Sequence, residues 1–234
     1  APQTLAQFEE LARIGIDLAR ALDHAHEQGV IHRDVKPGNV LIDPHGRPVL
    51  LDFGLARDER REQVTHSGEF VGTLAYTAPE QARGERVDRR VDVYGLGATL
   101  YHLATGATPY AARTLTDLVR KLESGPPASA SRINRKLPPD LALVLDRAVA
   151  ADPKQRYASC ADLADDLQRF QRGDPVSAAS PGLWSDVRAL RRRHKVLFAS
   201  AFTATVALSV GAATTLWQAR RVQQQKEITA TLFD

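Results

Sequence analysis

The sequence predicts a mainly α-helical domain with a small β-hairpin, followed by a single transmembrane helix. Helical stripes of apolar residues recur through residues 1–173, two short apolar runs flank a turn, and residues 196–217 contain no charged residue. The single cysteine, Cys160, excludes an internal disulfide and a metal cluster built from cysteines. Much of the formal net charge of +3 comes from one basic run, residues 188–195, so the composition does not indicate binding to nucleic acid.

The first helix and the hairpin are predicted from the spacing of apolar residues. A helical stripe begins at Leu11 and stops at Gly29. Two apolar runs, residues 39–42 and 49–51, are separated by a polar segment with a glycine in the turn, which is typical of a hairpin. Residues 55–80 have no periodicity and many charges, so we expect a long functional loop there.

Four further helices are expected in the second half of the domain. They are predicted over residues 91–105, 114–123, 139–151 and 159–171. The first of these is apolar on most sides and should be buried all round. The second opens with a Thr-x-x-Asp pattern that caps a helix N-terminus. By composition, residues 174–195 form a basic linker.

Residues 196–217 are predicted to cross a membrane as one helix. At ~1.5 Å per residue these 22 residues span roughly 33 Å, against about 30 Å of bilayer hydrocarbon. A buried core helix is the alternative, but a charge-free run of this length is unusual in one. Five Lys or Arg residues precede the span and three follow it, which favours a cytoplasmic domain at the inner membrane, with residues 218–234 beginning an extracytoplasmic region. Small residues at four-residue spacing in the span are compatible with a homodimer.

Residues 30–43, VIHRDVKPGNVLID, carry the residue types that phosphoryl transfer needs. Such a site requires a base that orients the hydroxyl, cations that absorb charge, and fixed geometry. Asp34 can accept the hydroxyl proton, Lys36 can place a positive charge beside the moving phosphoryl group, and Asn39 offers an oxygen to a hard cation such as Mg²⁺. Asp52 follows the second hairpin strand, so its carboxylate is expected to face the same metal as Asn39. Taken singly, each residue is equally a turn former or a solvated charge.

These motifs, in this order, resemble those of the protein kinase family, specifically bacterial Ser/Thr kinases of the eukaryotic (Hanks) type. HRDVKPGN at residues 32–39 is similar to the catalytic loop, and DFG at residues 52–54 is similar to the magnesium-binding turn. GTLAYTAPE at residues 72–80 resembles the end of an activation segment, and DVYGLG at residues 92–97 resembles the start of the central buried helix. Arg156 stands where relatives place the arginine that pairs with the last Glu of the activation segment.

The resemblance implies the C-terminal lobe of a protein kinase over residues 1–173. ATP and Mg²⁺ would be the cofactors, and proteins with Ser or Thr hydroxyls would be the substrates. The resemblance assigns catalysis to Asp34, Lys36 and Thr73, the metal to Asn39 and Asp52, and the floor under adenine to Leu41. Lys36 indicates the Ser/Thr branch, since tyrosine kinases of this family usually lack a lysine there.

Further residues have structural or regulatory roles by the same resemblance. The structural ones are His32 packed against Phe53, Gly54 in the metal-binding turn, Asp92 holding the backbone of the catalytic loop, and Glu80 paired with Arg156. Arg33 is placed to receive a phosphate from the loop that follows, where Thr65 and Ser67 carry the only hydroxyls between residues 55 and 72. We predict autophosphorylation of one or both, with two solvated side chains as the alternative.

Nothing before residue 32 matches the family's Gly-rich phosphate loop, its strand lysine or the glutamate that holds this lysine. We therefore expect a fragment of a membrane-anchored Ser/Thr kinase that lacks the smaller lobe and has little activity alone. The alternative is a non-catalytic, kinase-like membrane scaffold or binding module. The joint presence of Asp34, Lys36, Asn39 and Asp52 favours the kinase, because a module without catalysis has little physical need for all four.

Overall fold

The protein is described here by a computed structural model that covers three stretches of the chain. The described residues are 1–53, 74–112 and 114–179. The chain divides into two compact units, residues 1–185 and 186–234, and the described residues all belong to the first. The fold below is therefore that of the first unit.

Several predictions from the sequence concern residues outside the described part. They are the membrane span at residues 196–217, the loop hydroxyls of Thr65 and Ser67, and the motif residues Gly54 and Thr73. Within the described part, no helix combines the length and the apolar character that crossing a bilayer requires.

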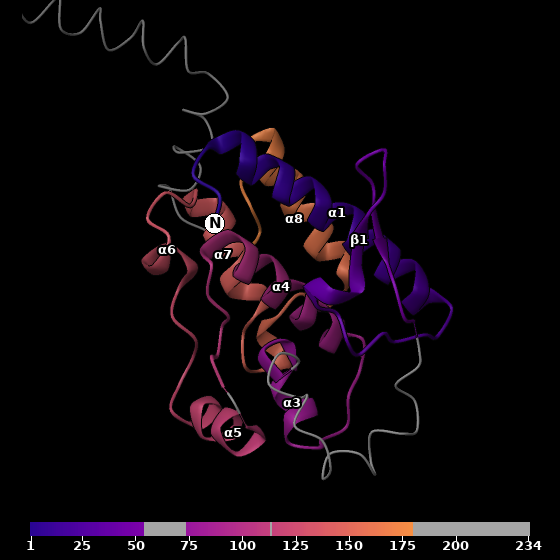
Figure 1. Ribbon diagram of the computed structural model, residues 1–234, viewed down its shortest axis with the longest axis vertical. Coiled ribbons are helices and arrows are strands. Elements are labelled where there is room, and N and C mark those ends of the chain that lie inside the picture. Colours follow the sequence, from indigo (N-terminus) through magenta and orange to yellow (C-terminus); the bar gives the residue numbers. More distant parts are fainter. Residues whose placement is uncertain (54–73, 113, 180–234) are drawn as a thin grey trace, which may run out of the picture. The chain divides into compact units, whose positions relative to one another are not determined.

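Two long helices, α1 (Leu5–Glu27) and α8 (Cys160–Arg172), pack side by side (Figure 1). Both are amphipathic, and their apolar stripes supply buried core residues such as Leu22 and Leu163. The N-terminus of α1 is fixed by a capping box in which the Thr4 side chain accepts a hydrogen bond from the Gln7 backbone N–H. This cap explains why α1 begins before the apolar stripe that predicted it.

The central helix α4 (Arg90–Thr105) is buried over most of its length, as its all-round apolar sequence predicted. It contacts α1, α8, α6 (Ala130–Ile133) and α7 (Pro139–Ala148). A Cβ atom added at Gly97 would lie 2.6 Å from Cβ of Ala148, so only glycine allows α4 and α7 to approach this closely. The core of the unit is thus organised around α4.

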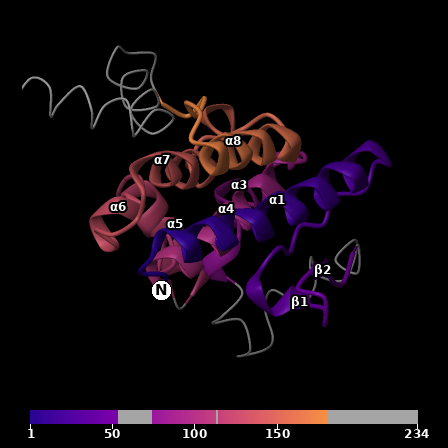
Figure 2. The same cartoon turned by 90° about the horizontal axis from the view of Figure 1, so that it is seen from above.

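A two-stranded antiparallel hairpin follows α1 and projects from the helical body (Figure 2). Strand β1 (Val40–Ile42) pairs with β2 (Pro48–Leu50), with Leu41 opposite Val49. Gly46 occupies the turn with φ of 78°, a left-handed backbone that favours glycine. The mainly α fold with one small hairpin therefore agrees with the prediction.

Helix ends in the second half of the unit follow the predicted capping signals. Helix α5 (Leu115–Glu123) is capped by Thr114, whose Oγ1 accepts a hydrogen bond from the Asp117 backbone N–H at 3.1 Å. Helix α8 ends at Gly173, which has φ of 73° and turns the chain back onto the domain. These local signals are strong because each satisfies backbone groups that a helix end leaves unpaired.

The predicted end of one helix, residue 151, was wrong. Helix α7 stops at Ala148, because Val149 leaves the helical conformation with ψ of 15° and residues 149–151 lie outside the helix. Five short elements were not predicted, since three or four residues are too few to show a period. They are η1 (Pro37–Asn39), η3 (Leu74–Tyr76), α3 (Pro79–Ala82), α6 and η4 (Pro153–Gln155).

Candidate active site

The loop between α1 and the hairpin is anchored to the central helix through one buried carboxylate. Asp92, in the first turn of α4, is fully buried. Its Oδ2 accepts the backbone N–H of His32 at 2.8 Å, and its Oδ1 accepts the backbone N–H of Arg33 at 2.7 Å. Helix α4 therefore fixes the backbone just before Asp34.

Sequence reasoning missed a third group on this carboxylate. His26, in the last turn of α1, donates from Nε2 to Asp92 Oδ2 at 2.7 Å, and its side chain is only 2 % exposed. A signal was present in the sequence, because residue 26 lies one helical turn after Leu22 and so continues the apolar stripe of α1. A polar side chain on a buried stripe needs a buried partner, and Asp92 is that partner.

Two side chains converge on the Asp34 carboxylate. Lys36 Nζ lies 2.9 Å from Asp34 Oδ2, and Asn39 Nδ2 donates to both the backbone carbonyl of Asp34 (2.8 Å) and Oδ2 (3.1 Å). The Asp34 side chain is 14 % exposed and that of Lys36 is 23 % exposed. Such a carboxylate is held in one orientation and still reaches solvent, as a base that receives a proton from a substrate must.

His32 sits beside this group as a packing residue. Its Nδ1 accepts the Asp34 backbone N–H at 3.2 Å, and its Nε2 donates to the Leu51 carbonyl at 2.8 Å. Both ring nitrogens are thus used by backbone groups, and the neutral ring satisfies both. The ring also meets Phe53 edge to face at a centroid distance of 4.9 Å. His32 has no nitrogen left for acid–base chemistry.

The predicted metal residues lie on adjacent backbone. The Leu51 N–H donates to the Asn39 carbonyl at 2.8 Å, so Asp52 follows directly after a residue bonded to Asn39. Asp52 is exposed and has φ of 60°, a left-handed conformation that Asp tolerates better than most residues. Because the Asn39 amide nitrogen is committed to Asp34, the amide oxygen is the group that remains for a cation.

These residues fit Mg²⁺ as it is bound beside phosphates. Mg²⁺ prefers oxygen ligands and is typically held by one or two carboxylates together with water and substrate phosphates. Asn39 and Asp52 offer one amide oxygen and one carboxylate for this purpose. No group of three or more His, Cys, Asp or Glu side chains in the described residues is arranged to hold a metal. One amide oxygen and one carboxylate match the small set of protein ligands that Mg²⁺ takes when substrate phosphates and water complete its coordination.

Two arginines make contacts with helix α3, Arg33 from the catalytic loop and Arg156 from the segment before α8. Arg33 has φ of 67°, and its carbonyl accepts Nε2 of Gln81, in α3, at 3.0 Å. Its own Nε is buried and has no hydrogen-bond partner among the described residues. Arg156 binds Glu80 through two hydrogen bonds of 2.6 and 2.7 Å. The predicted pair between α3 and the segment before α8 is thus present.

The hairpin presents apolar side chains to solvent next to the metal residues. Leu41 is 56 % exposed, and Ile42 and Val49 are also exposed. The structure thus places Leu41 in β1, two residues after Asn39, while Asp52 lies two residues after the end of β2.

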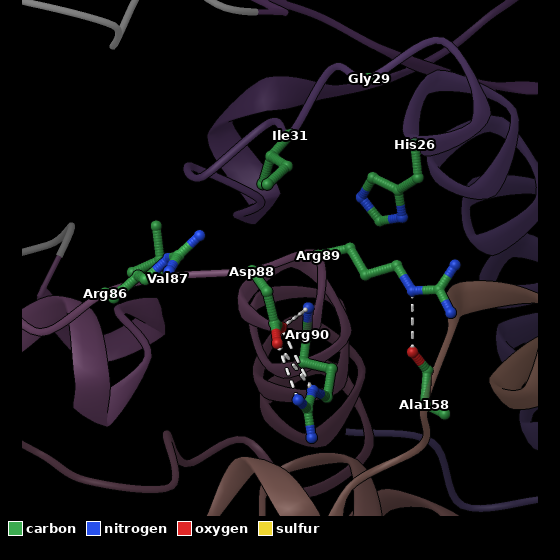
Figure 3. A pocket seen from close by; sticks show the side chains of 9 residues that line it. All are labelled: His26, Gly29, Ile31, Arg86, Val87, Asp88, Arg89, Arg90 and Ala158. Carbon is green, nitrogen blue, oxygen red and sulfur yellow. Dashed lines mark hydrogen bonds and ion pairs between the residues drawn. The ribbon is translucent and has the colours of Figure 1, made fainter.

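A pocket of about 650 Å³ lies elsewhere, between the end of α1 and the start of α4 (Figure 3). It is lined by His26, Gly29, Ile31, Ala158 and residues 86–90. Asp88 and Arg90 are bonded to each other in its wall, and Arg89 donates to the Ala158 carbonyl. Asp34, Lys36, Asn39 and Asp52 are absent from its lining, so we assign it no part in the chemistry.

Comparison with known proteins identifies relatives that match most of the described residues. The model of the protein kinase domain matches residues 3–167. The chain is 37 % identical over 164 residues to serine/threonine-protein kinase PknB of Mycobacterium tuberculosis, covering 69 % of this chain and 26 % of that protein. It is 33 % identical over 173 residues to a probable serine/threonine-protein kinase of Clostridium perfringens, covering 74 % and 25 %. The chain thus spans about a quarter of the length of these relatives.

Proposed function

Because this chain belongs to the protein kinase family, we propose that it acts in ATP-dependent phosphorylation of protein Ser and Thr hydroxyls. The observation that carries this proposal is the convergence of Lys36 and Asn39 on the Asp34 carboxylate. The relatives named above are Ser/Thr kinases by name, and Lys36 stands where that branch carries a lysine.

Each of the proposed site residues has a defined task in this reaction. Asp34 orients the substrate hydroxyl and takes its proton, while Asn39 keeps the carboxylate from rotating. Lys36 lies close enough to Asp34 to place its charge beside the group in transfer. Asn39 and Asp52 would hold Mg²⁺, and Leu41 would contact adenine. When bound, the magnesium–ATP complex supplies the phosphoryl group and neutralises part of its charge. Thr73 would hydrogen-bond near Asp34 and Lys36.

Regulation is proposed to act through Arg33. A buried guanidinium nitrogen without a partner among the described residues is costly, and a phosphate oxygen would satisfy it. Thr65 and Ser67 are the candidate phosphorylated residues. Phosphorylation of either would order the loop against the catalytic loop.

We also propose that the protein is anchored in the inner membrane by residues 196–217, with the described unit in the cytoplasm. The supporting observations are the length of the charge-free run and the excess of basic residues before it. A homodimer through the span is compatible with this arrangement. A protease-protection assay on membrane vesicles tests the orientation, since residues 1–195 should be cleaved only from the cytoplasmic side.

The catalytic proposal is tested with the complete gene product that contains these residues. Transfer of phosphate from ATP to a protein substrate should occur in the presence of Mg²⁺ and should be lost in Asp34→Asn. The matched control is Asp165→Asn, an exposed Asp on α8, which should retain activity. If the unsubstituted protein binds its partners but transfers no phosphate, the alternative of a kinase-like membrane scaffold takes the place of the enzyme.

A further inference from the structure

The first residues after α8 are fastened to the domain by a buried carboxylate. Asp166, in the middle of α8, is 1 % exposed. Its Oδ1 accepts the backbone N–H of Ser177 at 2.7 Å, and its Oδ2 accepts the Ser177 hydroxyl at 2.9 Å and the Ala178 N–H at 3.0 Å. We call residues 174–179 the strap. The sequence alone placed them in a linker.

Apolar contacts support the same attachment. Val176 is 4 % exposed and belongs to the hydrophobic core, and Ala178 and Ala179 pack against that core. The strap begins where Gly173 reverses the chain, and the Asp174 N–H donates to the Arg169 carbonyl at 2.9 Å. The strap is therefore a docked part of the domain rather than a free linker.

The carboxylate of Asp166 depends on these donors. Its fourth hydrogen bond comes from the Tyr157 hydroxyl at 2.8 Å, and burial together with the nearby Asp166 raises the pKa of Tyr157, which keeps that hydroxyl protonated. A buried carboxylate is stable only when hydrogen-bond donors reach its oxygen atoms, and the strap supplies three of the four donors. The strap therefore supplies most of the hydrogen bonds that this buried carboxylate receives.

Ser177 is the exposed point of this attachment. Its hydroxyl also accepts a hydrogen bond from Arg147 Nη1 at 3.1 Å. Arg147 is already engaged, because its guanidinium lies 4.4 Å from the centre of the Tyr157 ring. The other cation near Asp166 is Arg169, whose Nε is 3.8 Å from Oδ1 and whose side chain is 53 % exposed. Within the described part of the chain, the charged groups bonded to Ser177 or paired with Asp166 are thus Asp166 itself, Arg147 and Arg169.

We propose that Ser177 is a phosphorylation site and that phosphate on its hydroxyl releases the strap from Asp166. The transfer forms a bond between Ser177 Oγ and the γ-phosphorus of ATP, breaks the bond from that phosphorus to the bridging oxygen, and leaves ADP. The hydroxyl proton, given to Asp166 as a hydrogen bond in the docked strap, passes to the catalytic base. The assignment of this transfer to the protein's own kinase activity rests on the proposed function.

The phosphate would release the strap for two reasons: it places negative charge next to Asp166, and it removes the hydrogen bond that the Ser177 hydroxyl donates to that carboxylate. Phosphorylation adds about −1.5 to −2 charge and removes the hydroxyl donor. This charge would lie beside a buried carboxylate that has lost one of its four hydrogen bonds. Arg147 contacts Tyr157 and Arg169 lies near Asp166, so the two arginines offset only part of the charge. Because docked Ser177 donates to Asp166, it is phosphorylated while the strap is transiently free, and the phosphate then prevents redocking.

Release would lengthen the connection to residues 196–217. Six residues add at most roughly 20 Å when extended, at about 3.3–3.6 Å per residue. A domain tethered to a membrane through this linker would reach substrates farther from the surface. The phosphate would therefore control reach rather than the chemistry at Asp34.

The undocking is measured by amide hydrogen exchange on the full chain in detergent, without ATP. Phosphoserine is introduced genetically at position 177 in one protein and at position 131 in the control, where Ser131 is exposed on α6. Relative to the unmodified protein, the amides of Ser177 and Ala178 should exchange at least tenfold faster with phosphoserine at position 177. Their exchange rates should not change with phosphoserine at position 131. Equal or slower exchange would mean that Arg147 captures the phosphate, and it overturns the release.

The acceptor is identified by phosphosite mapping of the complete gene product after incubation with magnesium–ATP. Phosphate should be found on Ser177 and should be absent from Asp34→Asn treated in the same way. Phosphorylation at other sites with Ser177 unmodified overturns Ser177 as an acceptor while leaving the kinase intact. Absence of phosphate at every site instead overturns the proposed activity, and the exchange experiment still decides whether a phosphate can release the strap.

Discussion

Arg156 and Glu80 form a bidentate ion pair in the interior of the protein, with Nη1 to Oε1 at 2.6 Å and Nη2 to Oε2 at 2.7 Å. Both residues are under 5 % exposed, and Arg156 also donates to backbone carbonyls of residues 90, 150 and 151. The pair joins α3, where the predicted activation segment ends, to the loop before α8. It thereby ties two distant parts of the sequence to the start of α4.

Glu80→Ala should destabilise the domain by about 3–5 kcal/mol, because it leaves a buried guanidinium without its counter-charge. Urea denaturation followed by circular dichroism measures the loss. The control is Glu10→Ala, which breaks a bidentate pair with Arg13 on the exposed face of α1 and should cost at most about 1 kcal/mol. Equal losses in the two variants would show that burial does not govern this pair.

Gly97→Ala should destabilise the domain by about 1–3 kcal/mol, because the new methyl group would lie 2.6 Å from Cβ of Ala148. Adding Ala148→Gly removes the opposing methyl and should recover part of the loss. Gly38→Ala is the matched control, since its nearest neighbour would be 4.0 Å away at the end of the Lys36 side chain. Thermal unfolding distinguishes the three, and a neutral Gly97→Ala would contradict the close packing of α4 and α7.

Stability should fall at alkaline pH because buried tyrosines retain their protons. Burial raises the pKa of Tyr101 to about 12, and the pKa of Tyr157 is raised further by burial and by Asp166. A raised folded-state pKa means that the unfolded chain ionises first, so the stabilisation is complete below about pH 10 and is lost as the pH rises toward 12. The slope is at most about 1.4 kcal/mol per pH unit for each tyrosine.

Urea midpoints at about pH 8, 10 and 11 measure this decline. Tyr101→Phe removes one ionisable group and should make the slope between about pH 10 and 11 shallower. It also leaves the Ala128 carbonyl without the donor that Tyr101 provides at 2.6 Å, so stability at about pH 8 should drop modestly. A midpoint that stays constant up to about pH 11 would contradict the raised pKa values.

Arg33→Met should remove the response to loop phosphorylation. In the complete gene product, we expect phosphatase treatment to lower the transfer rate and rephosphorylation of Thr65 or Ser67 to restore it, whereas Arg33→Met should stay low in both states. Arg20→Met, on an exposed position of α1, is the control and should respond as the unsubstituted protein does. A phosphopeptide map of active protein with neither Thr65 nor Ser67 occupied ends this hypothesis.

The sequence by itself determined the features that depend on neighbouring residues. Apolar spacing predicted α1, α4, α5 and α8, and side-chain caps such as Thr114 marked where a helix begins. The order of motifs around Asp34 and Asp52 indicated the family before any contact was known. Such signals are readable because they come from local periodicity, backbone hydrogen bonding and chemistry at fixed spacing.

Only the tertiary structure decided the long-range contacts that no family motif implied. It placed His26 on Asp92, 66 residues away, and fastened Ser177 to Asp166 across the end of α8. The sequence assigned the strap to a linker because DPVSAAS is small and polar, and composition does not reveal that a buried carboxylate needs its donors. Long-range polar contacts follow from how helices pack. The local sequence can mark a buried polar residue such as His26, but the packing decides its partner.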